Sequence, residues 1–211
     1  MDDENHAAHD PLKAISAEQA QAIVLGACRP DPFVIQSCSL SPCGGYWVIR
    51  ANTAECVLEG RWERCYVGVN AYLINTESGE QEIVGSGESV DDYLEDQCDV
   101  RVAADQYYVL GPDFESGDKV LTIRLHQKLG CGLQMALNML SEPNRRWLTG
   151  TRRVLTHACA LLEREGIPNT VTLQDNVGPA VALQHARFWP EVQAALRRIE
   201  PRIDTRQPKT P

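Results

Sequence analysis

Two strand-like segments separated by a tight turn constrain the fold of this chain more than any other feature. Residues 69–75 alternate their side chains between two faces, with Tyr72 and Ile74 on one of them, and residues 81–85 follow as a second strand. The turn between them contains Gly79, which supplies the positive φ that such turns often require. The sequence therefore predicts an antiparallel β-hairpin.

The segments around this hairpin predict helices and one further strand. Residues 16–19, Ser-Ala-Glu-Gln, have the pattern of a capping box and predict a helix over 17–27. Residues 45–51 are rich in aromatic and β-branched side chains, which is typical of a strand. A helix is predicted over 90–97, because acidic residues occupy its first turn. Residues 29–45, with three prolines, are expected to form a loop or a short strand.

The second half of the chain has mostly helical periodicity. Residues 119–129 are ambiguous, since their apolar spacing suits either a strand or a helix. The other predicted elements are a helix over 133–140 ended by Pro143, a short strand at 146–148, a helix over 151–165, a strand at 170–173, and a final helix over 181–199 interrupted near Pro190.

These elements predict an α+β protein with two small domains. Residues 16–105 form a helix plus an antiparallel sheet, and residues 106–200 form a compact, helix-rich α/β sandwich. Residues 1–15 and 201–211 are expected to be flexible ends. A length of 211 residues suits this division.

Charge is distributed unevenly along the chain and bears on the class of partner. Residues 1–118 hold 22 acids and 6 bases, whereas residues 119–211 hold 7 acids and 14 bases. The acidic half would repel nucleic acid and anionic membranes and would attract a basic protein. The arginine pairs of the second half lack the interleaved aromatic residues of a nucleic-acid platform. We therefore expect a protein partner, and neither nucleic acid nor a membrane.

The eight cysteines are expected to be reduced and mostly buried, with the protein located in the cytoplasm. The first residues, Met-Asp-Asp-Glu-Asn, are acidic, unlike a secretory signal, and the apolar runs are shorter than the roughly 18 residues of a membrane span. No pair of cysteines has the spacing of a zinc knuckle, so no metal is expected.

Catalytic patterns in the chain are weak. Cys159 lies two positions after His157 on a predicted helix, so their side chains point to different faces. Neighbouring acids such as Asp91 and Asp92 fit an exposed helix start without acid–base catalysis. The glycine-rich stretches at 85–87 and 130–132 lack the remaining residues of a phosphate-binding loop. We expect no enzymatic activity and no cofactor.

Candidate partner-binding residues lie in the acidic half. Trp62 is flanked by Arg61, Glu63 and Arg64, which indicates a half-exposed position of the kind that anchors interfaces. Residues 65–100 contain nine acids and no lysine or arginine. The carboxylates expected to pair with a basic partner are those of Glu77, Glu80, Glu82, Glu88, Asp91 and Asp92.

The first half resembles a known family over residues 16–98. The residues that carry the resemblance are Tyr46-Trp47-Val48-Ile49, the run from Asn70 through Thr76 and Gly79 to Glu80, Val84-Gly85-Ser86-Gly87, and Asp92-Tyr93-Leu94. In this order they resemble the immunity protein 35 family, whose members are encoded beside polymorphic toxins. The resemblance implies that the protein neutralises one toxin by binding it, without catalysis.

The second half resembles, more weakly, the C-terminal domain of the bacterial ribosomal stalk protein. The matching residues are Lys119-Val120, Ile123-Arg124, the run from Leu129 to Leu133, Ala136, Pro143, Leu161-Leu162-Glu163, Gly166 and Val171-Thr172-Leu173. Cys131 replaces a leucine of that family's pattern, and its factor-docking lysines do not carry over. The resemblance implies an adaptor fold in which residues 119–129 are a helix.

The function expected from these observations is toxin neutralisation by direct protein–protein contact. The alternatives are a chaperone-like stress protein that holds unfolded chains and a ribosome-associated adaptor. The activity of the toxin, the mode of inhibition, the role of the second domain, the oligomeric state and the redox state of the cysteines stay open.

Overall fold

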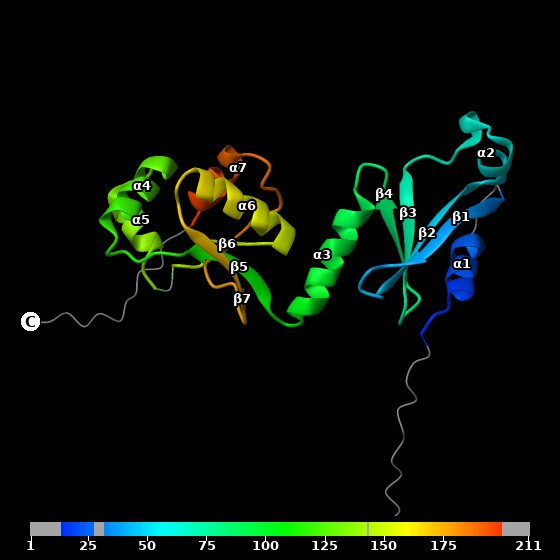
Figure 1. The fold of residues 1–211 in the computed structure, drawn as a ribbon, viewed down its shortest axis with the longest axis horizontal. Helices are drawn as coiled ribbons and strands as arrows, with labels where there is room; N and C mark the ends of the chain where they lie inside the picture. Colours follow the sequence, from blue (N-terminus) through cyan, green and yellow to red (C-terminus); the bar gives the residue numbers. More distant parts are fainter. Residues whose placement is uncertain (1–13, 28–31, 143, 200–211) are drawn as a thin grey trace, which may run out of the picture. The chain divides into compact units, whose positions relative to one another are not determined.

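The computed structural model describes residues 14–27, 32–142 and 144–199 (Figure 1). They form two compact units that divide between Cys98 and Asp99. Each unit combines helices with a four-stranded sheet, which confirms the α+β class. The division falls inside helix α3 (Val90–Ala103), whereas the expected domain boundary, after residue 105, falls in the turn that follows it.

The first unit is an antiparallel sheet with helices before and after it. Its strands are β1 (Phe33–Leu40), β2 (Tyr46–Thr53), β3 (Val69–Asn75) and β4 (Gln81–Gly85), and they pair in that order. Its other elements are α1 (Ala17–Gly26), α2 (Ala54–Glu59), the 3-10 turn η1 (Trp62–Arg64) and the start of α3.

The two faces of this sheet are buried against different helices. Ile49, Tyr72 and Ile74 pack with Ala20 and Val24 of α1. On the other face, Tyr46, Ala71, Leu73 and Val84 pack with Val90 and Leu94 of α3. Because β3 is covered on both sides, its residues 71–74 are all buried, which explains an apolar run where a half-exposed strand would alternate.

The predicted hairpin and first helix are confirmed. In the turn, Asn75 Oδ1 accepts hydrogen bonds from the backbone N–H groups of Glu77 (2.9 Å) and Ser78 (3.0 Å), and Gly79 has φ +74°. At the start of α1, Ser16 Oγ accepts from the Gln19 N–H (3.3 Å) and Gln19 Oε1 accepts from the Ser16 N–H (2.9 Å). This is the predicted capping box.

The second unit contains a mixed sheet and four helices within the described residues. Its strands are β5 (Tyr107–Pro112), β6 (Leu148–Thr149), β7 (Asn169–Gln174) and β8 (Val181–Ala182), in the order β7-β5-β6-β8. Its helices are α4 (Lys119–Leu129), α5 (Leu133–Met139), α6 (Arg152–Arg164) and α7 (Trp189–Leu196). The β6–β8 pair is parallel and the others are antiparallel.

The core of the second unit surrounds Trp147, whose side chain is fully buried. The indole Nε1 donates to the carbonyl of Met139 (2.9 Å), and the ring meets Phe114 edge-on. Residues 119–129 are a helix: Asp118 caps its start by accepting from the Leu121 N–H (3.0 Å), and Gly130 ends it with φ +60°.

Four predicted elements differ from the structure. The strand predicted at 146–148 is β6, Leu148–Thr149, which shares one residue with the prediction. Residues 33–40 form a full strand, because they pair with β2 along its length while the neighbouring prolines lie outside the paired segment. Helix α3 extends beyond residue 97 to Ala103. Residues 181–199 are a short strand and an eight-residue helix, because Pro190 lies in the first turn of α7, where a missing N–H costs nothing.

The expectation of reduced cysteines is wrong for four of them. Cys43 bonds to Cys98, and Cys56 bonds to Cys65, both within the first unit. Cys38, Cys131 and Cys159 are free, and Cys28 lies outside the described residues. The pairs have no sequence signature beyond an even count, so the absence of a signal-like start misled the prediction.

Some predictions concern residues outside the described ranges. The predicted ends, 1–15 and 201–211, and the helix stop at Pro143 lie outside the described residues, except for residues 14 and 15. Ile15 is held by backbone hydrogen bonds, because its N–H donates to Thr76 (2.7 Å) and its carbonyl accepts from Trp47 Nε1 (2.7 Å). None of the helices in the described residues combines the length and the apolar composition that crossing a bilayer would take.

Candidate protein-binding surface

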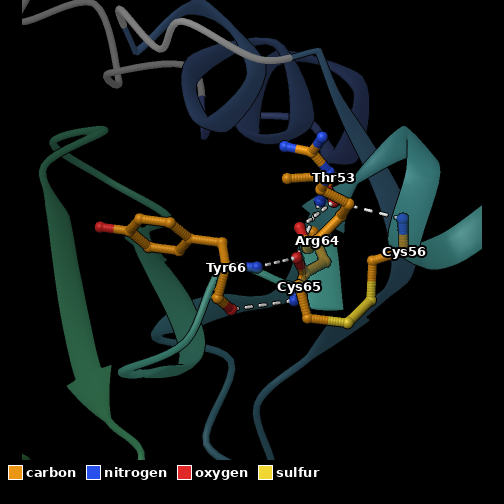
Figure 2. The surroundings of a disulfide bond; sticks show 6 residues. Thr53, Cys56, Arg64, Cys65 and Tyr66 are labelled. Carbon is orange, nitrogen blue, oxygen red and sulfur yellow. Dashed lines mark hydrogen bonds between the residues drawn. A yellow bond between two sulfur atoms is a disulfide. The ribbon is translucent and has the colours of Figure 1, made fainter. Parts of the chain in front are cut away.

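The connection between β2 and β3, residues 54–68, is the most unusual segment of the first unit, and we call it the stapled loop. It begins with α2, turns at Gly60 (φ +70°) and continues through η1. Thr53 holds both ends, because its Oγ1 accepts from the Cys56 N–H (3.2 Å) and donates to the Arg64 carbonyl (2.8 Å). Figure 2 shows these contacts around the disulfide.

Further contacts fix the shape of the loop and tie it to the sheet. The Cys56–Cys65 disulfide joins α2 to the residue after η1 (Figure 2). Asn52 of β2 binds the backbone of Tyr66 twice: Oδ1 accepts from its N–H (2.7 Å), and Nδ2 donates to its carbonyl (3.1 Å). The Tyr66 ring also packs edge-on against Phe33, with centroids 5.6 Å apart. The loop therefore has a defined conformation despite its surface position.

Four large apolar side chains of this rigid loop are exposed. The exposed fractions are 71% for Leu58, 80% for Trp62, 51% for Tyr66 and 81% for Val67. Single exposed apolar residues are ordinary, but several from one short segment indicate an interaction site. Tryptophan and tyrosine are also the residues most often found at the energetic centre of protein interfaces.

The cations of the stapled loop are paired within it. Arg61 contacts Glu59 (Nε–Oε2, 3.2 Å) and Glu55 (Nη1–Oε2, 3.7 Å), and Arg64 contacts Glu55 (Nε–Oε2, 3.4 Å). The Glu55 Oε2 accepts no hydrogen bond, so these are ion pairs without hydrogen-bond geometry. Such exposed pairs add little stability. Their effect is to cancel the charge of both arginines, which leaves the acidic residues beside the loop to set the local potential.

Three of the expected carboxylates lie next to the loop. Gly85, the last residue of β4, pairs with Val69, the first residue of β3, so α3 begins at the end of the sheet where the stapled loop lies (Figure 1). Backbone contact is direct, because the Ser86 N–H donates to the carbonyl of Gly68 (3.1 Å). The exposed acidic residues at the start of α3 are Glu88, Asp91 and Asp92. The structure thus brings Trp62 and these three acids to one end of the unit.

The other expected carboxylates do not join this group. Glu77 and Glu80 are exposed, but they lie in the β3–β4 turn at the opposite end of the hairpin. Glu82 is only partly exposed, and its two oxygens accept hydrogen bonds from the hydroxyls of Tyr46 (3.0 Å) and Tyr93. The Glu82 carboxylate is thus engaged inside the unit.

Sequence reasoning missed Leu58, Tyr66 and Val67. Their exposure follows from the disulfide and from the Asn52 contacts, neither of which a hydrophobicity pattern contains. The available signal was Cys56 and Cys65, which flank Trp62 closely enough to close a small loop.

The residues considered for catalysis do not form a reactive arrangement. Burial raises the pKa of Cys159 to about 11, with the charge of Glu163 adding to the effect, so its thiol is protonated at neutral pH. Burial also raises the pKa of Cys131. Among the described residues, no three His, Cys, Asp or Glu side chains are grouped to hold a metal ion. A hollow beside Glu55 has a volume of about 60 Å³, well below that of a typical ligand pocket.

The arrangement is suited to binding a protein: a rigid apolar projection with carboxylates on one side. Comparisons with protein-family models, with curated proteins and with solved structures find no match to this chain.

Proposed function

We propose that this protein binds a bacterial toxin and neutralises it by direct contact, with the stapled loop and the adjacent carboxylates as the contact surface. The observation that carries the proposal is the exposure of Leu58, Trp62, Tyr66 and Val67 on a segment held by a disulfide. The identification of the partner as a toxin is supported by the resemblance of residues 16–98 to the immunity protein 35 family.

Rigidity of the loop favours tight binding. Association costs free energy when mobile loops and side chains become ordered at an interface. Here the disulfide, Thr53 and Asn52 order the backbone before any partner arrives. Burial of the Trp62 side chain in a pocket of the partner then contributes to affinity with little further loss of entropy.

Charge defines the chemistry of the partner surface. Glu88, Asp91 and Asp92 lie at the same end of the first unit as the stapled loop, while Arg61 and Arg64 are paired within the loop. The complementary surface is an apolar pocket flanked by lysine or arginine. Such pairing speeds association and weakens as salt increases.

The first test is a rescue assay with a variant of the projection. The toxin domain encoded by the neighbouring reading frame is expressed in a sensitive bacterium, alone or with this protein. We expect rescue by the wild type and a loss of affinity of about 30-fold for Trp62→Ala, as for a central interface residue. The Kd of the purified complex measures this effect directly.

Phe188→Ala is the matched control, because Phe188 is also an exposed aromatic residue (65%) but belongs to the second unit. We expect Phe188→Ala to rescue the bacterium as well as the wild type does and to bind the toxin with wild-type affinity. Equal affinity of wild type and Trp62→Ala for a toxin that is neutralised would exclude the stapled loop as the contact. A neighbouring toxin that is neither bound nor neutralised would exclude toxin binding.

Chaperone-like holding of unfolded chains is the second candidate, favoured by the same exposed apolar side chains. It differs in selectivity, because a holding protein binds many chains weakly, whereas a neutralising protein binds one partner tightly. Suppression of aggregation of unrelated reduced proteins, lost in Trp62→Ala and without a tight toxin complex, would favour this candidate. A ribosome-associated adaptor would instead sediment with ribosomes.

The disulfides favour an oxidising location for the first unit, since the cytoplasm keeps most cysteines reduced. The proposal therefore does not retain the cytoplasmic location expected from the sequence. The protein would bind a secreted or periplasmic toxin in the compartment where the Cys56–Cys65 disulfide is formed.

A further inference from the structure

Strand β7 of the second unit has an unprotected outer edge. It is the terminal strand of its sheet, and among the described residues its outer edge has no paired strand. Its six residues, Asn-Thr-Val-Thr-Leu-Gln, pair with β5 in continuous register without a bulge. They include no proline and no charged residue, the features by which edge strands usually prevent pairing. The edge is therefore open to an added strand.

A groove lies beside this strand on the α6 face of the sheet, between β7, α6 and the last turn of α3. It has a volume of about 600 Å³, within the usual range of ligand sites. Its floor includes Tyr108 of β5 and Leu173 of β7, which are register partners on one face of the sheet. The wall formed by α6 presents Arg152, Thr156 and Cys159, whose spacing places them on one side of the helix.

The dimensions of the groove fit a short extended chain. From Arg152 to Cys159 the helix rises by roughly 10 Å. An extended chain spans that distance with about three residues. Side chains on the α6 face of the added chain would lie beside Leu173 and enter the groove, while the backbone would pair with the outer edge of β7. This is how peptides bind in β-strand addition.

One end of the groove is cationic. Arg152 is the charged residue among the described residues that line it. Its Nη1 lies 3.4 Å from Asp99 Oδ1, and its side chain is 61% exposed against 12% for Asp99. A single contact to Asp99 holds the guanidinium in place and leaves other N–H donors for a second carboxylate.

We propose that the second unit binds an extended peptide segment of a partner protein by adding it to β7. The segment carries apolar side chains at alternate positions, which pack beside Leu173 and enter the groove, and an acidic side chain that pairs with Arg152. This site is independent of the stapled loop, so the two can bind different parts of one partner or two different partners.

The test uses the full oxidised chain and a defined probe. The probe is a fluorescent heptapeptide of alternating threonine and valine with a glutamate at each end, so that either strand direction places a carboxylate near Arg152. Fluorescence anisotropy gives the Kd, and hydrogen exchange reports the backbone amides of residues 169–174. We expect saturable binding and slower exchange in this segment, because an added strand would bond its outward amides.

Two variants and a second peptide define the contacts. Arg152→Gln should weaken binding about tenfold by removing a charge-assisted pair, whereas Arg164→Gln, at the other end of the same helix, should have no effect. Thr156→Lys should also weaken binding, because it fills the groove without removing the Arg152–Asp99 pair. A probe with proline at its centre should not bind, because proline lacks the N–H needed for strand pairing.

Three outcomes would overturn the proposal. The first is unchanged exchange of residues 169–174 at saturating probe. The second is an equal effect of Arg152→Gln and Arg164→Gln on a folded protein. The third is a dimer by light scattering in which these amides are already protected without probe, because the occupant of the edge would then be a second copy of this chain.

Discussion

At the scale of single residues, Glu82 joins three elements of the first unit. It lies on β4, and its carboxylate accepts hydrogen bonds from Tyr46 of β2 (3.0 Å) and from Tyr93 of α3. Burial raises the pKa of Tyr93, and the hydrogen bond and charge of Glu82 raise it further. A folded-state pKa above the unfolded value means that this contribution to stability is complete at neutral pH. It is lost only as pH rises above about 10, the ordinary tyrosine value.

We predict that Glu82→Ala destabilises the first unit by about 2–4 kcal/mol, because two partly buried hydroxyls lose a charged acceptor. The free energy of unfolding from urea titration measures the loss. Glu80→Ala is the control, since Glu80 is exposed in the nearby turn and should change stability by less than about 0.5 kcal/mol. Spectroscopic titration should also show the pKa of Tyr93 moving back toward its ordinary value. Equal losses in the two variants would contradict the role given to Glu82.

Residue type and local spacing could not separate Glu82 from its neighbours in the sequence. Glu80, Glu82 and Glu88 look alike in the sequence, since each is a single acid between two uncharged residues. Glu82 differs because strand pairing and helix packing bring Tyr46 and Tyr93, 36 and 11 residues away along the chain, to its carboxylate. By contrast, exposure of Trp62 was predictable, because charged residues flank it on both sides.

At the scale of elements, the stapled loop depends on one disulfide for its shape. We predict that replacing Cys56 and Cys65 together by serine lowers the free energy of unfolding by about 2–3 kcal/mol, as expected for closure of a short loop. Toxin affinity should fall by at least about tenfold even where the unit remains folded, because the apolar side chains lose their fixed arrangement. Calorimetric titration of the folded variant measures this loss.

Replacement of Cys43 and Cys98 by serine is the matched control for the loop. This disulfide joins the β1–β2 turn to α3, away from the stapled loop, so its loss should reduce stability without a comparable loss of affinity. Similar toxin affinities of the two double variants would show that Trp62 can contact the toxin without the Cys56–Cys65 bond.

Elements whose own residues contain a turn or a helix cap were predicted closely. Elements that form only because a neighbouring strand or helix packs against them were not. The β3–β4 hairpin contains its turn residues, and α1 contains its capping box, so both were predictable. Residues 33–40 become a strand only because β2 lies beside them. Residues 119–129 were ambiguous because Val120 and Ile123 are exposed while Leu125 and Leu129 are buried, which blurs the apolar stripe.

At the scale of the whole molecule, the two units differ in the chemistry of their cysteines. Both disulfides belong to the first unit. The free thiols of the second unit, Cys131 and Cys159, have raised pKa values because of burial, so they react slowly with oxidants and alkylating agents at neutral pH. A change of redox conditions should therefore act on one unit and leave the other unchanged.

This asymmetry gives a prediction for thermal unfolding. The Cys43–Cys98 bond closes a separation of 55 residues, which corresponds to about 4 kcal/mol in a chain-entropy estimate. A reducing agent should lower the Tm of the first unit by at least about 10 °C, given the steep dependence of Tm on stability in domains of this size. The Tm of the second unit should not change. Scanning calorimetry gives the two transitions, and hydrogen exchange during heating assigns each to its unit.

The outcome also tests whether the units are energetically separate. If both transitions fell together, α3, which contains the division between the units, would couple their unfolding. If neither moved although alkylation showed every thiol to be free after reduction, the disulfides would contribute nothing to stability. A shift confined to the first unit would make the stapled loop a redox-sensitive contact within a chain whose β7 groove keeps its shape in either condition. Binding at the two sites could then be measured separately by changing only the reductant.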